Sequence, residues 1–145
     1  MLKVLLATVA CLVLNSNALA QATPVGLWKT IDDETKLEKS FVRITEAGGV
    51  LTGKVEKIVD PAKQDSKCEK CTDDRKDKAV LSMTLVRNTK QSAEDKEVWD
   101  GGDILDPNNG KVYRLRLKPL DGGKTMEVRG YIGPFFRNQM WIRAE

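Results

Sequence analysis

The residues with the clearest chemical potential in this sequence are two cysteines, Cys68 and Cys71, which are separated by two residues in the stretch DSKCEKCTDDRKD. A pair at this spacing can be a thiol–disulfide redox centre, half of a metal site or a structural disulfide. A redox centre of the thioredoxin type needs a strand that leads into a helix, because the helix N-terminus lowers the thiol pKa. No such pattern surrounds this pair, so a structural disulfide in a loop is favoured and a redox role stays as the alternative.

The sequence contains no histidine. Its absence excludes the Ser-His-Asp and Cys-His nucleophile systems, an imidazole base, and zinc or haem held by histidine. Two cysteines without a second pair also lack the usual zinc ligand set, so we predict no metal, no other cofactor and no catalytic residue. Carboxylate pairs such as Asp100 with Asp103 are numerous, and their context singles out none. A carboxylate-based hydrolase is therefore the weaker enzyme alternative.

Residues 1–20 have the features of a secretory signal peptide: Lys3, an apolar run over residues 4–14, and an Ala-x-Ala end at Ala20. The apolar run is too short to span a bilayer, and no other stretch reaches that length. We therefore expect a periplasmic or secreted protein, cleaved after Ala20, with no transmembrane span and one domain over residues 21–145. Cleavage also removes Cys11, and an even pair of cysteines in an oxidising compartment is typical of a disulfide.

The charges of the chain are mixed in sign, with 24 Lys and Arg against 21 Asp and Glu. Since there is neither a basic stripe nor an aromatic RNA-binding signature, no nucleic-acid partner is expected. Acidic and basic residues also interleave over residues 60–78, which is typical of a solvated loop. The stretch Asp106-Pro107-Asn108-Asn109-Gly110 reads as a hairpin turn, because a calcium loop starting there would need a carboxylate where Leu117 stands.

Short β-like runs alternate with Gly, Asp, Asn and Pro throughout the predicted domain, and no window sustains a helical apolar repeat. Hairpin turns between successive runs indicate a meander, and closing such a sheet removes its exposed edges. The sequence therefore predicts an all-β fold, a single antiparallel meander barrel of about eight to nine strands. The expected strands cover residues 25–30, 41–45, 50–59, 80–87, 97–99, 102–105, 111–118, 125–132 and 139–143.

Several of these runs alternate strictly, which separates an inner face from an outer one. A barrel of about eight strands either fills its interior with side chains or holds one small ligand, and the pattern leaves both open. The expected inner residues form a candidate apolar ligand pocket. They are Leu81, Met83, Leu85, Tyr113, Leu115, Met126 and Val128.

Two adjacent aromatic residues, Phe135 and Phe136, follow a Gly-Pro turn between the last two expected strands. If both face water they mark a docking surface or a cavity mouth at the barrel rim. The favoured interpretation is that one of them closes the barrel end and the other covers the hairpin.

Four motifs resemble a known family: Gly26-Leu27-Trp28, the run over residues 101–113, the run over residues 129–133, and Trp141-Ile142-Arg143. Together they are similar to an uncharacterised domain-of-unknown-function family of small exported bacterial proteins with a lipocalin-like barrel. This resemblance implies a fold and a compartment, and no established activity. The Gly-x-Trp start also resembles the lipocalin signature, which implies that Trp28 and Arg143 close one end of the barrel through a cation–π contact of ~0.5–2 kcal/mol.

These observations together predict an exported, non-catalytic binding protein. The expected partner is a small apolar ligand or lipid held in the barrel, or an envelope or extracellular protein recognised by the rim loops. The alternatives are a thiol-disulfide redox protein that uses Cys68 and Cys71, and the carboxylate-based hydrolase.

Overall fold

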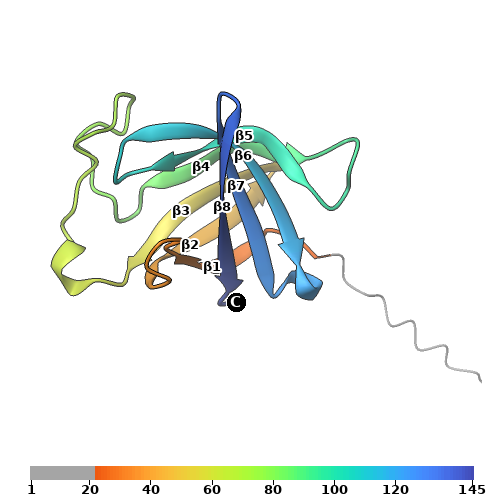
Figure 1. Cartoon of the computed structure of the whole chain (residues 1–145), viewed down its shortest axis with the longest axis horizontal. Helices are drawn as coiled ribbons and strands as arrows, with labels where there is room; N and C mark the ends of the chain where they lie inside the picture. The colour runs from red at the N-terminus through yellow and green to blue at the C-terminus, as the bar shows by residue number, and fades with distance from the viewer. Residues whose placement is uncertain (1–21) are drawn as a thin grey trace, which may run out of the picture.

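Eight antiparallel strands form a closed barrel in the computed structural model, which describes residues 22–145 (Figure 1). The predicted signal peptide, residues 1–20, lies outside the described residues. Short 3-10 turns follow β3 and β6, namely η1 (Pro61–Lys63) and η2 (Asp121–Gly123). The strands are β1 (Gly26–Ile31), β2 (Glu38–Ala47), β3 (Val50–Ile58), β4 (Thr84–Gln91), β5 (Trp99–Asp106), β6 (Lys111–Leu120), β7 (Thr125–Ile132) and β8 (Phe135–Arg143).

Each strand pairs with the next one along the chain, and β8 pairs with β1 to close the sheet. This arrangement confirms the predicted antiparallel meander barrel. The closing seam is short: β1 pairs with β8 through Trp28 opposite Arg143 and Lys29 opposite Ile142. The first half of β8 and the last residues of β1 are therefore not paired with each other through their backbones.

Several predicted strand boundaries differ from the structure, two of them for a clear reason. The expected strands 97–99 and 102–105 belong to one strand, β5, so eight strands are present where up to nine were predicted. The expected strand 80–87 instead begins at Thr84, because Ser82 has a positive φ of 68° and the chain turns there. The amide of Ser82 donates to the carbonyl of Val55 at 2.8 Å, which ties this turn to β3.

Alternation on β6 and β7 is as the sequence predicts, with Leu115, Leu117, Met126 and Val128 buried inside and Arg114 exposed outside. Side chains fill the end of the barrel at which β1 begins. The fully buried residues of that end are Trp28, Val42, Ile44, Leu51, Leu117 and Met126. The opposite end, where β1 finishes and β2 starts, is open.

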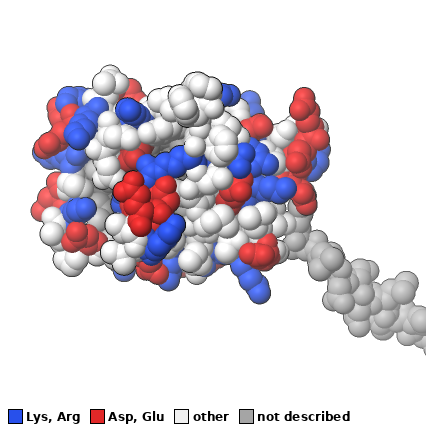
Figure 2. All heavy atoms as spheres, viewed as in Figure 1, with Lys and Arg blue, Asp and Glu red and all other residues white. Residues whose placement is uncertain are grey.

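The outer surface carries charges of both signs, and Figure 2 shows Lys and Arg side chains interleaved with Asp and Glu over the visible face. Between residues 22 and 145 there is no helix with the length and apolar character required to cross a bilayer.

Candidate functional site at the open end of the barrel

A cavity of about 560 Å³ occupies the open end of the barrel. Its floor is apolar, and its upper wall and rim are polar. The floor and inner wall consist of Val55, Ile58, Val80, Leu85, Ile104, Leu105, Val128 and Trp141. Polar and charged side chains from the β1–β2 loop, the long β3–β4 loop, the β5–β6 hairpin and β8 form the rim. A volume of this size falls within the range of small-molecule sites, ~300–1,000 Å³.

The floor centres on Trp141, which is only 2% exposed. Alternation along β8 turns Arg137, Gln139 and Trp141 toward the interior, and the indole Nε1 of Trp141 donates to Gln139 Oε1 at 3.2 Å. Because this hydrogen bond satisfies the indole N–H, the floor presents an apolar ring to the cavity.

Hydrogen bonds between side chains hold the polar wall in place. The hydroxyls of Thr30 and Ser40 lie 2.8 Å apart on neighbouring strands, and Asn109 Nδ2 donates to the Tyr113 hydroxyl at 2.9 Å. These pairs leave hydroxyl and amide groups at the boundary between the apolar floor and the solvent. The cavity can thus receive a molecule that has an apolar body and a polar end.

Ion pairs fix the β1–β2 side of the rim. Lys39 Nζ lies 3.3 Å from Asp32 Oδ2, and Arg137 forms a close bidentate ion pair with Asp33. Backbone N–H donation from Thr35 lowers the pKa of Asp32, and hydrogen bonding from Arg137 lowers that of Asp33. Both carboxylates are therefore charged at neutral pH. The Arg137–Asp33 pair also bridges the gap above the short β1–β8 seam.

Two lysines of the long loop, Lys63 and Lys67, line the cavity and form no ion pair with any residue of the described chain. They are available to a negatively charged group at the mouth.

Only some of the residues that the sequence assigned to the ligand pocket line the cavity. Leu85, Tyr113 and Val128 line the cavity, whereas Met83, Leu115 and Met126 are buried without lining it. Leu81 does not face the interior: it lies in the turn before β4 and is 38% exposed. The turn at Ser82 is the physical reason, since it interrupts the alternation that the sequence suggested.

Sequence reasoning missed the contribution of β8, although a signal was present. The run FFRNQMWIR alternates so that Arg137, Gln139 and Trp141 share one face, and all three line the cavity. The predicted strand began only at residue 139, and its inward residues were not assigned. The loop residues of the rim carry no comparable periodic signal.

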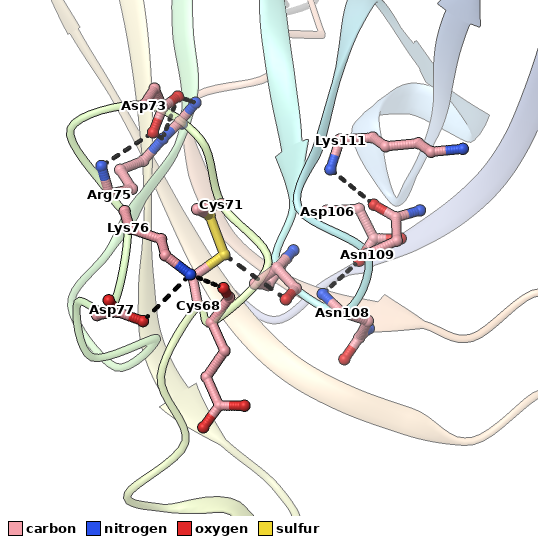
Figure 3. The surroundings of a disulfide bond; sticks show 12 residues. Cys68, Cys71, Asp73, Arg75, Lys76, Asp77, Asp106, Asn108, Asn109 and Lys111 are labelled. Carbon is pink, nitrogen blue, oxygen red and sulfur yellow. Dashed lines mark hydrogen bonds and ion pairs between the residues drawn. A yellow bond between two sulfur atoms is a disulfide. The ribbon is translucent and has the colours of Figure 1, made fainter.

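The long loop between β3 and β4 forms one wall of the mouth and contains the predicted disulfide between Cys68 and Cys71 (Figure 3). Both cysteines are buried, at 0% and 2% exposure, and Cys68 Sγ lies 3.7 Å from the Pro107 carbonyl oxygen of the β5–β6 hairpin. Gly110, with a φ of 72°, allows the hairpin to approach the Lys70 backbone so closely that a Cβ would collide with it. Since solvent barely reaches the sulfurs, the disulfide stabilises the cavity wall and is poorly placed for exchange with another thiol.

Two arginine–aspartate pairs anchor this loop to β4. Arg75, which is 4% exposed, binds the carboxylate of Asp73 and donates through Nη1 to the Thr84 carbonyl at 2.9 Å. Arg87 makes a bidentate contact with Asp74, with both distances 2.9 Å. Hydrogen bonding from Arg75 lowers the pKa of Asp73 to about 2. The charged loop is thus pinned to the barrel, which the mixed charge of its sequence did not indicate.

The filled end of the barrel contains the pair that the lipocalin resemblance implied. The Arg143 guanidinium lies 4.2 Å from the Trp28 ring centroid and donates to the carbonyls of Thr23, Val25 and Gly123. Burial lowers the pKa of Arg143. The Trp28 indole N–H donates in turn to the Pro24 carbonyl at 2.7 Å.

The aromatic turn between β7 and β8 differs from the favoured interpretation. Phe135 is 73% exposed and Phe136 is 58% exposed, so neither closes the barrel nor is covered by the hairpin. The tight pairing of Ile132 with Phe135 and of Tyr131 with Phe136 extends the hairpin beyond the barrel wall, where no other strand can cover it.

The carboxylates that line the cavity are Asp32, Glu34 and Asp106. Asp100 and Asp103 do not line the cavity. Between residues 22 and 145, no three Cys, Asp or Glu side chains gather at a spacing that suits a metal ion.

Comparisons with known proteins agree with this architecture. A search of curated proteins found no match. Among solved structures, the chain is similar to protein HP1028 from the human pathogen Helicobacter pylori, described as belonging to the lipocalin family, with a TM-score of 0.72 and 17% sequence identity over 86% of this chain and 84% of that chain. At this identity the likeness concerns the fold. Residues 26–143 match the family described as an uncharacterized protein conserved in bacteria, so the chain belongs to the DUF2147 family.

Proposed function

We propose that this protein binds a small, largely apolar molecule in the cavity at the open end of its barrel. The observation that carries the proposal is the cavity of about 560 Å³, with an apolar floor around Trp141 and a polar rim. A site of this kind buries the apolar body of a ligand and leaves its polar end near water. The lipocalin-like fold supports the proposal, because a barrel of this strand number can hold one small ligand.

The floor also supplies a spectroscopic test. Of the three tryptophans, Trp141 lines the cavity, whereas Trp28 and Trp99 do not. We expect the uncharged apolar dye N-phenyl-1-naphthylamine to bind, and its emission to rise on excitation of tryptophan. Energy transfer should weaken strongly in Trp141→Phe, which keeps the floor apolar, and remain in the matched control Trp99→Phe. Absence of saturable dye binding would contradict the proposal.

A second pair of variants tests whether the dye occupies the cavity. Ile104 lines the cavity, and Val112 lies on the outer face of the adjacent strand with 44% exposure. Ile104→Trp should block the cavity and lower dye affinity by at least about ten-fold, which corresponds to roughly 1.4 kcal/mol. Val112→Trp should leave affinity unchanged. Equal affinity of both variants would place the dye elsewhere.

We also propose that the protein acts in the periplasm or outside the cell. The signal-like residues 1–20 and the disulfide between Cys68 and Cys71 support this location, since disulfides persist in oxidising compartments. Intact mass measurement of protein from the periplasmic fraction should give a chain that begins at Gln21. Recovery of the uncleaved chain from the cytoplasm would contradict this location.

A further inference from the structure

Exposed apolar side chains are concentrated on one side of the barrel. Across residues 22–145, nine large hydrophobic side chains are exposed, and six of them belong to β6, β7 and β8. The other three, Leu37, Val59 and Leu81, are scattered over two loops. The six are Val112, Ile132, Phe135, Phe136, Met140 and Ile142. Clustering of this kind marks an interaction surface more often than isolated exposed residues do.

Three of these exposed residues, Ile132, Phe135 and Phe136, lie in the turn over residues 132–136, which we name the β7–β8 tip. The tip is apolar on both faces, because Ile132 pairs with Phe135 on the inner side and Tyr131 pairs with Phe136 on the outer side. It projects past the neighbouring strands at the top of Figure 1. A projecting element that is apolar all round is suited to insertion into an apolar medium rather than to packing against one flat surface.

Arginines surround the base of the tip. The Arg129 guanidinium lies 4.5 Å from the Phe136 ring centroid, and the Arg114 guanidinium lies 5.2 Å from the Tyr131 ring centroid. Stacking of this kind fixes the cations beside the aromatic rings while their outer edges stay in water.

The outward charges of β6 and β7 are mainly positive, and we name them the basic face. Four cations, Arg114, Arg116, Lys118 and Arg129, stand against one acid, Glu127, which pairs with Arg116 at 2.9 Å and with Arg129 at 3.6 Å. Glu97 of the β4–β5 loop lies 3.8 Å from Lys118. Arg114 makes no ion pair within the described residues, although Asp103 of β5 lies opposite it in the strand register. With Glu127, Glu97 and Asp103 counted against the four cations, the surface next to the tip keeps a net positive charge.

We propose that the β7–β8 tip and the basic face dock onto an anionic lipid surface. The tip would enter the boundary between headgroups and acyl chains, where aromatic side chains are favoured, and the arginines would lie at the depth of the lipid phosphates. Charge complementarity selects this occupant, because an apolar element flanked by arginines matches an apolar layer flanked by phosphates. Docking in this way is a property of the surface and does not depend on the proposed ligand.

The proposed docking surface lies next to the mouth of the cavity. Gly130 and Arg137, at the base of the tip, belong to the cavity lining. A tip resting in the lipid interface would thus bring the mouth next to the membrane surface.

Co-sedimentation with vesicles tests the proposal. We expect the protein to bind vesicles of equimolar phosphatidylcholine and phosphatidylglycerol, to bind phosphatidylcholine vesicles weakly, and to dissociate from the mixed vesicles as salt rises. Phe135→Ser with Phe136→Ser should weaken partition into mixed vesicles by at least about ten-fold. Arg114→Gln with Arg129→Gln should remove most of the preference for the anionic vesicles.

Leu81→Ser is the matched control, since Leu81 is an exposed apolar residue of the β3–β4 loop, outside the β7–β8 tip, and the partition of this variant should equal that of the wild type. Both phenylalanines are exposed, so their variants should keep the wild-type circular dichroism and remain folded. The proposal is overturned if the wild type does not bind the mixed vesicles, if the double Phe variant binds as the wild type does, or if Leu81→Ser weakens binding equally. Tip-dependent self-association without vesicle binding would also overturn it.

Discussion

Replacing Arg143 with lysine tests whether one guanidinium holds the filled end of the barrel together. In the native protein this group stacks on Trp28 and donates to the carbonyls of Thr23, Val25, Gly123 and, at 3.3 Å, Glu145. A lysine keeps the positive charge, but its compact ammonium cannot stack as a plane and reach all of these acceptors at once. At least one acceptor beside the seam would lose its partner.

The cost follows from these contacts. Weakening the stack costs about 0.5–1 kcal/mol, and leaving a partly buried carbonyl without its charged donor costs about 1–2 kcal/mol. The free energy of unfolding should therefore fall by about 1.5–3 kcal/mol, which lowers the Tm by roughly 5–15 °C for a domain of this size. Urea unfolding followed by tryptophan fluorescence measures the difference, with an unchanged m-value if the native fold is kept.

Arg43→Lys provides the control. Arg43 contacts Glu56 and Glu145 on the outer surface, and exposed ion pairs contribute only about 0–1 kcal/mol. We expect the free energy of unfolding of this variant to lie within about 0.5 kcal/mol of the wild-type value. The reasoning is refuted if Arg143→Lys is equally stable, or if Arg43→Lys loses as much stability as Arg143→Lys.

Further predictions concern the loop and the rim. Cys68→Ser with Cys71→Ser should lower the free energy of unfolding by roughly 2 kcal/mol in urea and leave dye affinity within about two-fold, whereas complete loss of dye binding would mean that the disulfide shapes the cavity itself. Asp73 has a pKa lowered to about 2 from its ordinary 3.8, so the stability it provides is present above the ordinary value and lost as pH falls from about 4 to 2. In the wild type, cleavage of the long loop by an acid-stable protease should therefore accelerate as pH falls through this range. Asp73→Asn should be cleaved rapidly already at higher pH. A wild-type cleavage rate that does not change with pH would contradict this prediction. Asp33→Asn breaks the ion pair with Arg137. The rate of dye association in stopped-flow measurements should rise by several-fold, and it should no longer increase with salt as the wild-type rate does. An unchanged rate would show that this ion pair does not control access to the cavity.

The sequence predicts the fold better than the site. Strict alternation in KVYRLRLK and TMEVRGYI depends only on the two-residue period of a strand, and β6 and β7 lie where that period places them. The start of β4 could not be predicted, because apolar alternation continues through Ser82 although its positive φ and its bond to Val55 turn the chain. A contact between distant segments decides that boundary.

The same distinction applies to the cavity. Alternation along β8 would have identified Gln139 and Trp141, since they share a face within one strand. Lys63 and Lys67 reach the mouth only because the long loop folds against the β5–β6 hairpin, and no local pattern encodes that packing. For Phe135, hydrophobicity alone suggested burial, whereas its place at a projecting turn leaves nothing to bury it.

The short seam between β1 and β8 has a consequence for the kinetics of folding. It joins residues near the two ends of the domain, Trp28 with Arg143 and Lys29 with Ile142, so it carries the largest loop-closure entropy of any strand pair in the barrel. Such pairing forms late, after the local hairpins are in place, and interactions absent from the transition state act mainly on the rate of unfolding. The contacts of Arg143 thus determine how long the closed barrel persists rather than how fast it forms.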